Sequence, residues 1–322
     1  MKVLLTDTQQ SDTDLEREML QAAGMVCAEA QCRTPEEVIE AGQDADAFVA
    51  SYAPITEKVF AALPRLRLVT ALGVGVDHID VAAARRQEVW VANVPDANMN
   101  EVATHALAMA LTLTRHVAFF DRAVRAGQWD YAATGPLRRP AMLTFGILGL
   151  GRIGRQLAAL ARPSFKAVLG HDPYLSSSCW PEGVEPRDLE SLFRESDVLS
   201  LHLPYTEGNR NLVNHDRLAA MRSGSYLVNV ARGGLLDLDG LLHHLDSGRL
   251  AGAALDVLPQ EPPPPDHPVL RHPRIVVNPH AAFYSLESEE EARRKAIENV
   301  IIWARDGRPP YVIVQGKERA KT

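Results

Sequence analysis

The sequence predicts an α/β protein with two doubly wound parallel-sheet domains. Short apolar segments alternate with amphipathic, helix-like segments along most of the chain, which is the pattern of parallel strands covered by helices. A glycine-rich turn at residues 149–154 lies between an apolar segment and a helix-like one, near the middle of the chain. The length of 322 residues also exceeds one typical core and suits two domains.

In the first part of the chain, short apolar segments bounded by turn residues are expected as strands, at residues 2–7, 47–51, 66–72 and 89–93. Helices are expected between them, at residues 14–23, 35–41 and 56–63. Thr34 and Pro35 suit the N-cap and first position of the second helix. In the first helix we expect Leu15, Met19 and Ala22 to share the buried face.

A long apolar helix is expected at residues 98–115, followed by an irregular segment at 123–140 that is rich in Arg, Gly, Trp and Pro. After the glycine turn we expect a second set of strands, at residues 167–171, 198–202, 225–230, 252–255 and 274–277.

A charged helix is expected at residues 285–305, with Ser285 as its N-cap. Its apolar positions are spaced to form one face, made of Ala292, Ala296, Val300 and Trp303. We expect this face to pack back on the first unit. The first domain would then be discontinuous, formed by residues 1–97 and 287–322, with residues 98–286 as the inserted domain.

Composition excludes several classes of protein. The net charge of −7 argues against a direct nucleic-acid partner, which would require a basic surface. No apolar run approaches the roughly 20 residues that span a membrane, and the N-terminus does not resemble a signal peptide. The 3 cysteines have no metal-binding spacing, so we expect reduced thiols and a cytoplasmic protein.

The glycine turn has the spacing of a dinucleotide-binding fingerprint, Gly-x-Gly-x-x-Gly, after a strand and before a helix. Gly149 would allow the tight turn, Gly151 would let the backbone approach a pyrophosphate, and Gly154 would let the helix pack closely. Arg152 and Ile153 begin the helix, whose N-terminus would face the phosphates.

The acidic partner of this fingerprint is Asp172, which lies 18 residues after Gly154 at the end of an expected strand. A carboxylate at this place bonds the ribose hydroxyls and repels a 2′-phosphate. No Arg or Lys follows directly to bind such a phosphate, so the sequence favours NAD over NADP.

With these motifs the chain resembles the D-isomer-specific 2-hydroxyacid dehydrogenase family over nearly its whole length. The resemblance also rests on five blocks in order, LGVGVD at 72–77, LHLPYT at 201–206, NVARGG at 229–234, GAALDV at 252–257 and NPHAA at 278–282. It implies a Rossmann NAD-binding domain inserted into a flavodoxin-like substrate domain that is built from both chain ends. In motif it is most similar to the branch of the C-terminal-binding-protein corepressors.

Three residues suit the reduction of a 2-oxo acid. Arg232 follows an apolar strand at the edge where parallel sheets bind ligands, and a guanidinium there can hold a carboxylate and polarise the oxo group. His280 follows another strand and can exchange the proton of the hydroxyl group. Glu261 would accept the other ring N–H of His280 and stabilise its charged form. The resemblance implies the same three roles.

The resemblance implies further site residues. It puts Asp256 near the nicotinamide carboxamide. Along the ribose and nicotinamide it puts Leu203, Pro204, Thr206, Asn209, Val230 and Ala231. Backbone N–H groups of Val74 and Gly75 would hold the substrate carboxylate, and Ser51 and Tyr52 would line the side-chain pocket. Ordinary packing is an alternative role for Tyr52.

Some positions depart from the family pattern. Phe283 stands where the corepressor branch has tryptophan. Phe283 is also aromatic, so one wall of the pocket stays aromatic, which suggests a bulky or apolar substrate side chain. His78 and His171 replace a frequent asparagine and tyrosine. Glu261 makes formate an unlikely substrate, because formate dehydrogenases of the family carry glutamine at that position.

The expected function is therefore NAD-dependent interconversion of a D-2-hydroxy acid and its 2-oxo acid. Two alternatives stay open, an NAD(H)-gated corepressor-like binding protein and a dehydrogenase of phosphite or a phosphonate. We expect no metal, since the remaining histidines, His243, His244, His267 and His272 among them, lie in polar stretches and are expected to be solvated. The family implies a homodimer, with contacts along residues 98–115 and near Trp129.

Overall fold

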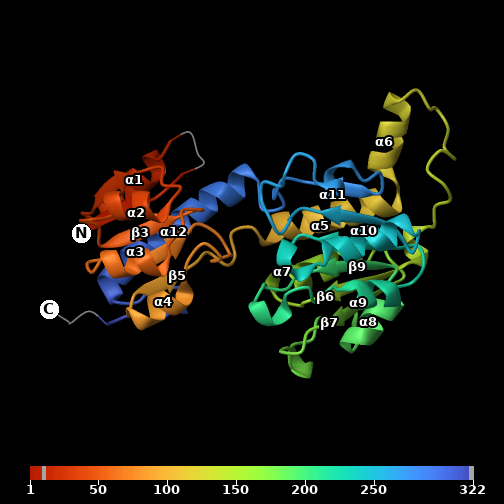
Figure 1. The fold of residues 1–322 in the computed structure, drawn as a ribbon. Coiled ribbons are helices and arrows are strands. Elements are labelled where there is room, and N and C mark those ends of the chain that lie inside the picture. Colours follow the sequence, from red (N-terminus) through yellow and green to blue (C-terminus); the bar gives the residue numbers. More distant parts are fainter. Residues whose placement is uncertain (9–11, 319–322) are drawn as a thin grey trace. The chain divides into compact units, whose positions relative to one another are not determined.

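The computed structural model describes residues 1–8 and 12–318. The chain divides into two compact units (Figure 1). Unit 1 comprises Met1–Asn98 and Ser285–Thr322, and unit 2 comprises Met99–Tyr284. These boundaries differ from the expected ones by one residue at the first crossing and by two at the second.

Unit 1 contains a six-stranded sheet in the order β13-β5-β4-β3-β1-β2. Its strands are β1 (Lys2–Leu5), β2 (Val26–Glu29), β3 (Ala47–Ala50), β4 (Leu68–Ala71), β5 (Trp90–Ala92) and β13 (Val312–Val314). The pairs between β1 and β5 are parallel, as expected, whereas β13 pairs antiparallel with β5. The sheet is thus parallel with one antiparallel edge strand.

Helices cover both faces of this sheet, because one core cluster contains residues of α2, α3 and α4 and another contains residues of α1 and α12. Their bounds are α1 (Asp14–Ala22), α2 (Pro35–Ala41), α3 (Glu57–Ala62), α4 (Val81–Arg86) and α12 (Leu286–Asp306). α2 begins with the expected cap, since Thr34 accepts from the N–H of Glu37 and the Glu37 side chain bonds back. α12 is capped by Ser285 and ends at Gly307, whose φ of 81° is left-handed.

The expected apolar face of α12 is confirmed, because Ala296, Val300 and Trp303 are buried in the core of unit 1. The expected face of α1 is only partly right, because Met19 packs against the core and Leu15 is half-buried, but Ala22 is exposed. Its buried residues are Glu16 and Leu20, since the Glu16 carboxylate takes two hydrogen bonds of 2.6 and 2.7 Å from Arg293 of α12. The ion pair turns a polar side chain toward the core, which helical periodicity cannot reveal.

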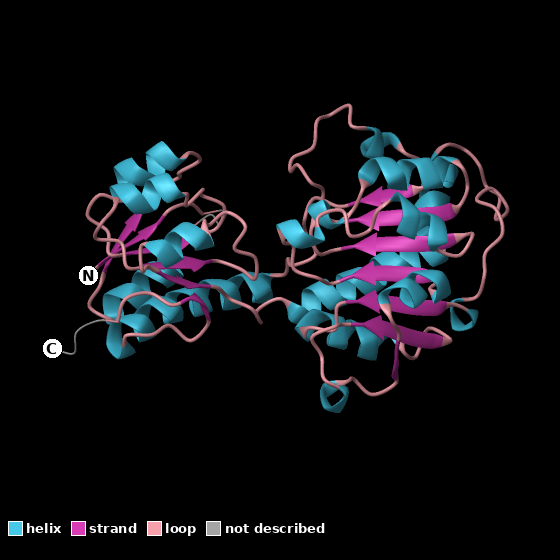
Figure 2. Cartoon of the chain, turned by 60° about the horizontal axis from the view of Figure 1, so that its bottom comes forward, coloured by secondary structure: helices cyan, strands magenta, loops and turns pink. Residues whose placement is uncertain are grey.

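Unit 2 contains a seven-stranded parallel sheet in the order β12-β11-β10-β9-β6-β7-β8 (Figure 2). Its strands are β6 (Thr144–Leu148), β7 (Ala167–His171), β8 (Val184–Pro186), β9 (Val198–Leu201), β10 (Ser225–Asn229), β11 (Leu250–Leu255) and β12 (Ile275–Val277).

Its helices are α5 (Met99–Thr114), α6 (Val117–Arg125), α7 (Arg152–Ala161), α8 (Leu189–Glu195), α9 (His215–Ala220), α10 (Leu238–Asp246) and α11 (Pro268–Arg271). Short 3₁₀ turns lie at Pro140–Met142, Ser177–Cys179, Glu207–Asn209 and Gly233–Leu235. One core cluster lies between the sheet and α5 with α7, and a second lies on the face covered by α8, α9 and α10. Because both faces are covered, ligands can reach the sheet only at its ends.

The structure corrects three further expectations. The segment expected to be irregular from residue 123 is helical up to Arg125, at the end of α6. His244 is buried, and its Nε2 lies 3.0 Å from the carbonyl of His215. His272 is mostly buried as well and lies 3.2 Å from Asp246. In the described part of the chain, no helix is long and apolar enough to cross a membrane.

Candidate active site

The glycine turn joins β6 to α7 in unit 2. Gly149 has a φ of 97°, and a Cβ there would lie 2.6 Å from the carbonyl oxygen of His202. A Cβ on Gly154 would lie 2.1 Å from the carbonyl oxygen of Gly149, so its absence allows the helix to approach the turn. At Gly151, which caps α7, a Cβ would meet no atom within 4 Å. The turn therefore leaves bare backbone and open space at a helix N-terminus, which fits a dinucleotide pyrophosphate.

Asp172 follows β7 beside this turn. Its carboxylate accepts hydrogen bonds from the N–H of Leu150, at 2.9 Å, and from that of Tyr174, at 3.0 Å. Leu150 belongs to the glycine turn itself. The carboxylate is thus held next to the turn by the backbone, at the place where the fingerprint requires an acidic group.

Two more loops leave the same edge of the sheet. After β9, the side chain of Asn209 accepts from the N–H of Thr206 at 2.7 Å and donates to the carbonyl of Pro204 at 2.8 Å, so it stiffens the loop. Leu203 lies against the turn, 2.9 Å from where a Cβ of Gly149 would stand. After β10, Val230 and Ala231 are buried.

Arg232 lies three residues beyond β10, as expected for a group at the carboxyl end of a strand. Its Nη1 donates to the carbonyl of Ala231 at 2.7 Å, and its own carbonyl accepts from Asn229. A Cβ on Gly233 would lie 2.0 Å from the backbone of Leu258. Gly233 therefore allows the segment of Arg232 to touch the segment that leads to Glu261.

Glu261 and His280 form a direct pair, with Glu261 Oε2 2.6 Å from His280 Nδ1. Glu261 Oε1 accepts from the N–H of Leu258 at 2.8 Å. Burial raises the pKa of Glu261. Hydrogen bonds from His280 and Leu258, together with the charges of His280 and Arg232, outweigh this effect, so the pKa of Glu261 lies below its ordinary value. Glu261 is therefore ionised at neutral pH, and the pair borders a pocket of about 440 Å³.

The backbone of His280 is held by Asp256, which follows β11. The N–H of His280 donates to the Asp256 carbonyl at 2.8 Å, and those of Ala281 and Ala282 donate to its two carboxylate oxygens at 2.9 Å each. The carboxylate is fully buried, and Phe283 lies edge-on to the His280 ring with centroids 6.2 Å apart.

In unit 1, Asp7 holds two of the expected residues. Its carboxylate accepts from the N–H of Ser51 at 3.0 Å and from that of Tyr52 at 2.7 Å. Tyr52 is 59% exposed, so ordinary packing does not account for it. His78 lies near the same carboxylate, where burial lowers the pKa of His78 and the charge of Asp7 opposes that shift.

Val74 and Gly75 lie in the loop after β4. The Val74 carbonyl accepts from the side chain of Asn93 at 2.7 Å. Within residues 1–8 and 12–318, neither the Val74 nor the Gly75 N–H donates to another group of the chain. Adjacent unbonded N–H groups are the kind of donor that an anion site uses.

Sequence reasoning missed four residues that support these groups, namely Asp7, Asn93, His105 and Asn278. Asp7 lies two residues after β1, and His105 is a polar residue beside the buried apolar face of α5, so the sequence contained an indication of both. Asn93 and Asn278 act through hydrogen bonds that no spacing rule indicates.

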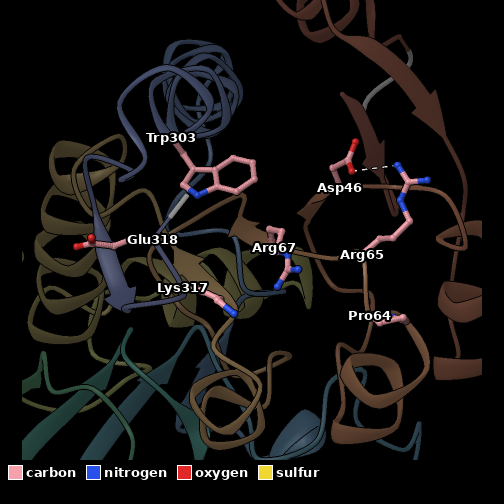
Figure 3. A pocket seen from close by; sticks show the side chains of 7 residues that line it. All are labelled: Asp46, Pro64, Arg65, Arg67, Trp303, Lys317 and Glu318. Carbon is pink, nitrogen blue, oxygen red and sulfur yellow. Dashed lines mark hydrogen bonds and ion pairs between the residues drawn. The ribbon is translucent and has the colours of Figure 1, made fainter. Parts of the chain in front are cut away.

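A separate pocket of about 450 Å³ lies in unit 1, and its described lining is Asp46, Pro64, Arg65, Arg67, Trp303, Lys317 and Glu318 (Figure 3). Arg65 pairs with Asp46 at 3.2 Å, and the described lining contains no histidine. The described lining therefore has no histidine–carboxylate pair. Within the described ranges, no group of His, Cys, Asp or Glu side chains is arranged to hold a metal ion.

A Rossmann sheet with this glycine turn and a histidine–carboxylate pair at the same edge defines a nicotinamide-dinucleotide oxidoreductase. The chain belongs to the D-isomer specific 2-hydroxyacid dehydrogenase family, whose NAD binding domain matches residues 107–282, more than half of the chain. It is an NAD-dependent dehydrogenase that acts on the CH–OH group of 2-hydroxy acids.

Among its relatives, a glyoxylate reductase of Korarchaeum cryptofilum is 37% identical over 288 residues, which cover 86% of this chain and 85% of that protein. The TT0316 protein from Thermus thermophilus superimposes with a TM-score of 0.86 at 31% identity, over 98% of this chain and 100% of that one. A D-lactate dehydrogenase from Aquifex aeolicus, solved with NAD and lactic acid, superimposes with a TM-score of 0.87 at 27% identity, over 98% and 100% of the chains.

Proposed function

We propose that the protein reduces a small 2-oxo acid to the D-2-hydroxy acid with NADH, and that it catalyses the reverse oxidation. The observation that carries this proposal is the 2.6 Å contact between Glu261 and His280. The charge of Arg232 also acts on the Glu261 carboxylate. One acid–base group and one cation for the substrate are what the reaction requires.

When bound, the cofactor supplies the hydride for reduction from its nicotinamide ring. The His280 imidazolium donates its Nε2 proton to the substrate oxygen, while Glu261 stays ionised and holds Nδ1. Arg232 binds the substrate carboxylate and polarises the oxo group. The N–H groups of Val74 and Gly75 in unit 1 are proposed to bind a carboxylate. In oxidation, neutral His280 takes the proton back.

The test is a panel of 2-oxo acids from glyoxylate to aromatic members, with phosphite and formate included for the oxidative direction. NADH consumption is followed by absorbance. We expect turnover of at least one 2-oxo acid and none of formate. If phosphite alone is oxidised, or if no compound turns over while NADH binds, the proposal is wrong.

The choice of cofactor gives a prediction about Asp172. We propose that its carboxylate bonds the ribose hydroxyls and excludes a 2′-phosphate. Asp172→Ser should lower the ratio of kcat/KM for NADH over NADPH by about 10–100-fold, since hydrogen bonds to a charged group contribute about 1.5–3 kcal/mol. Glu182→Ser, at an exposed carboxylate of the same unit, is the control. An unchanged ratio in Asp172→Ser would count against the assignment.

We also propose that the protein is a homodimer. The support is an arm of unit 2 formed by α6 and the segment after it (Figure 1). α6 has no buried residue, and Trp129 and Tyr131 are 89% and 90% exposed. So much exposed aromatic surface on one arm indicates a contact with another copy.

The doubly substituted variant Trp129→Asp, Tyr131→Asp should sediment as a monomer, because a charged interface core is strongly disfavoured. The measurement is analytical ultracentrifugation at equal concentrations. Leu286→Asp, at an apolar residue of unit 1 that is 74% exposed, should leave the mass unchanged. A wild-type monomer, or a dimer in the double variant, would refute the proposed contact.

A further inference from the structure

His105 on α5 has no part in the proposed chemistry, but its contacts indicate a role in the structure of the site. Its Nε2 lies 3.2 Å from Asn278 Oδ1 and 3.8 Å from Asp256 Oδ1. An amide oxygen only accepts hydrogen bonds, so Nε2 carries the proton and donates to Asn278. His105 thus lies close to Asn278, which begins the segment that carries His280, and to Asp256, which binds the backbone of that segment.

That segment, residues 278–282, is wrapped around Asp256. Asn278 donates its N–H to the Leu255 carbonyl at 2.9 Å, and the next three N–H groups after Pro279 all end on Asp256. His280 has a φ of 53°, in the left-handed region that residues with a side chain rarely adopt. Such a conformation persists only where its surroundings hold it.

The buried side chains of α5 explain why His105, which is partly buried, stands out. They are Val102, Ala103, Ala106, Met109, Ala110, Leu113 and Thr114, which are apolar apart from the terminal threonine. His105 is the position of this face that meets a buried carboxylate and an amide. An apolar residue there would leave the Asn278 oxygen without this donor and the Asp256 carboxylate without this polar neighbour.

We propose that His105 is a positioning residue of the dehydrogenase. Through Asn278 and Asp256 it keeps residues 278–282 in the conformation that sets the His280 ring against Glu261. The inference rests on the proposed role of His280, and it adds a residue from a helix that carries no other part of the proposed chemistry.

The experiment compares three variants of the full chain. His105→Leu removes the donor at similar volume. His105→Gln keeps an N–H donor at a similar reach, and Thr104→Leu alters the exposed neighbour on the same helix as a control. Hydrogen–deuterium exchange is read on the peptide that holds the N–H groups of residues 280–282. The kcat, the KM and the Kd for NADH are measured in parallel.

We expect exchange of that peptide to rise about tenfold in His105→Leu, and kcat to fall about tenfold, because small misplacement of a reacting group has a large effect on rate. The KM and the Kd for NADH should stay within about twofold. His105→Gln should restore both readouts, and Thr104→Leu should resemble the wild type.

Unchanged exchange at residues 280–282, an equal rise throughout unit 2, or a His105→Gln variant as impaired as His105→Leu would overturn the inference. If His105→Leu does not fold, Asn278→Ala removes the other partner of the His105–Asn278 hydrogen bond, and the same exchange and kinetic measurements are made on it. A wild type that reduces no 2-oxo acid would refute the proposed function, and the exchange readout would still decide the role of His105.

Discussion

His280→Ala is expected to lower kcat by about 10²–10⁴-fold, which is the usual contribution of a positioned acid–base group. The substrate oxygen would then have no proton donor at hydrogen-bonding distance, while the glycine turn and Asp172 would be unaltered. The Kd for NADH, measured by fluorescence, should therefore stay within about twofold of the wild type. The loss should appear in kcat and in kcat/KM, as for an interaction made in the transition state.

Two further variants make this result specific. Glu261→Gln keeps an oxygen that can accept from His280 Nδ1 but removes the charge, so a smaller loss, about tenfold, is expected. His243→Ala removes an exposed histidine of α10 and should have the wild-type rate. If His280→Ala keeps more than a tenth of the wild-type kcat, His280 is not the acid–base group.

Arg232→Leu is expected to reduce kcat/KM for the 2-oxo acid by about 10²–10³-fold, because truncating one partner of a desolvated charge pair costs about 2–5 kcal/mol. The loss should be divided between a higher KM and a lower kcat, since the guanidinium binds the carboxylate and polarises the oxo group. The NADH Kd again serves as the check that the Rossmann domain is intact.

The matched variant is Arg232→Lys, which keeps the charge but not the planar pair of donors. It should lie between the wild type and Arg232→Leu. If Arg232→Leu and wild type reduce the acid with the same kcat/KM, Arg232 does not bind the substrate carboxylate, and another cation must bind it.

The parts of the fold that local chemistry determines were predictable. α2 was expected at residues 35–41, with Thr34 as its cap, and the structure has it at Pro35–Ala41. β7 likewise lies at Ala167–His171 as expected. The edge strands β2, β8 and β13 were missed, because three or four residues are too short to show a strand period, even in the apolar Val312–Val314. The buried Glu16 depends on Arg293, far away in the sequence, and no local pattern contains that contact.

The candidate site also has a part that the sequence predicts and a part that it does not. Gly149, Asp172, Arg232 and His280 could be named in advance because each follows a strand at the carboxyl edge of a sheet. What could not be named is how His280 is held. Its left-handed backbone and the three N–H contacts of residues 280–282 with Asp256 arise from tertiary structure. The role we infer for His105 depends on those contacts, and the motifs say nothing of it.

The central claim is hydride transfer from NADH to C2 of a 2-oxo acid to form the D-hydroxy acid. The direct measurement uses NADH that carries deuterium at both C4 positions, followed by chiral chromatography and mass spectrometry of the product. We expect a D-2-hydroxy acid with one deuterium at C2, and no such product from His280→Ala on the same time scale. A product of L configuration, or one without deuterium at C2, would contradict it.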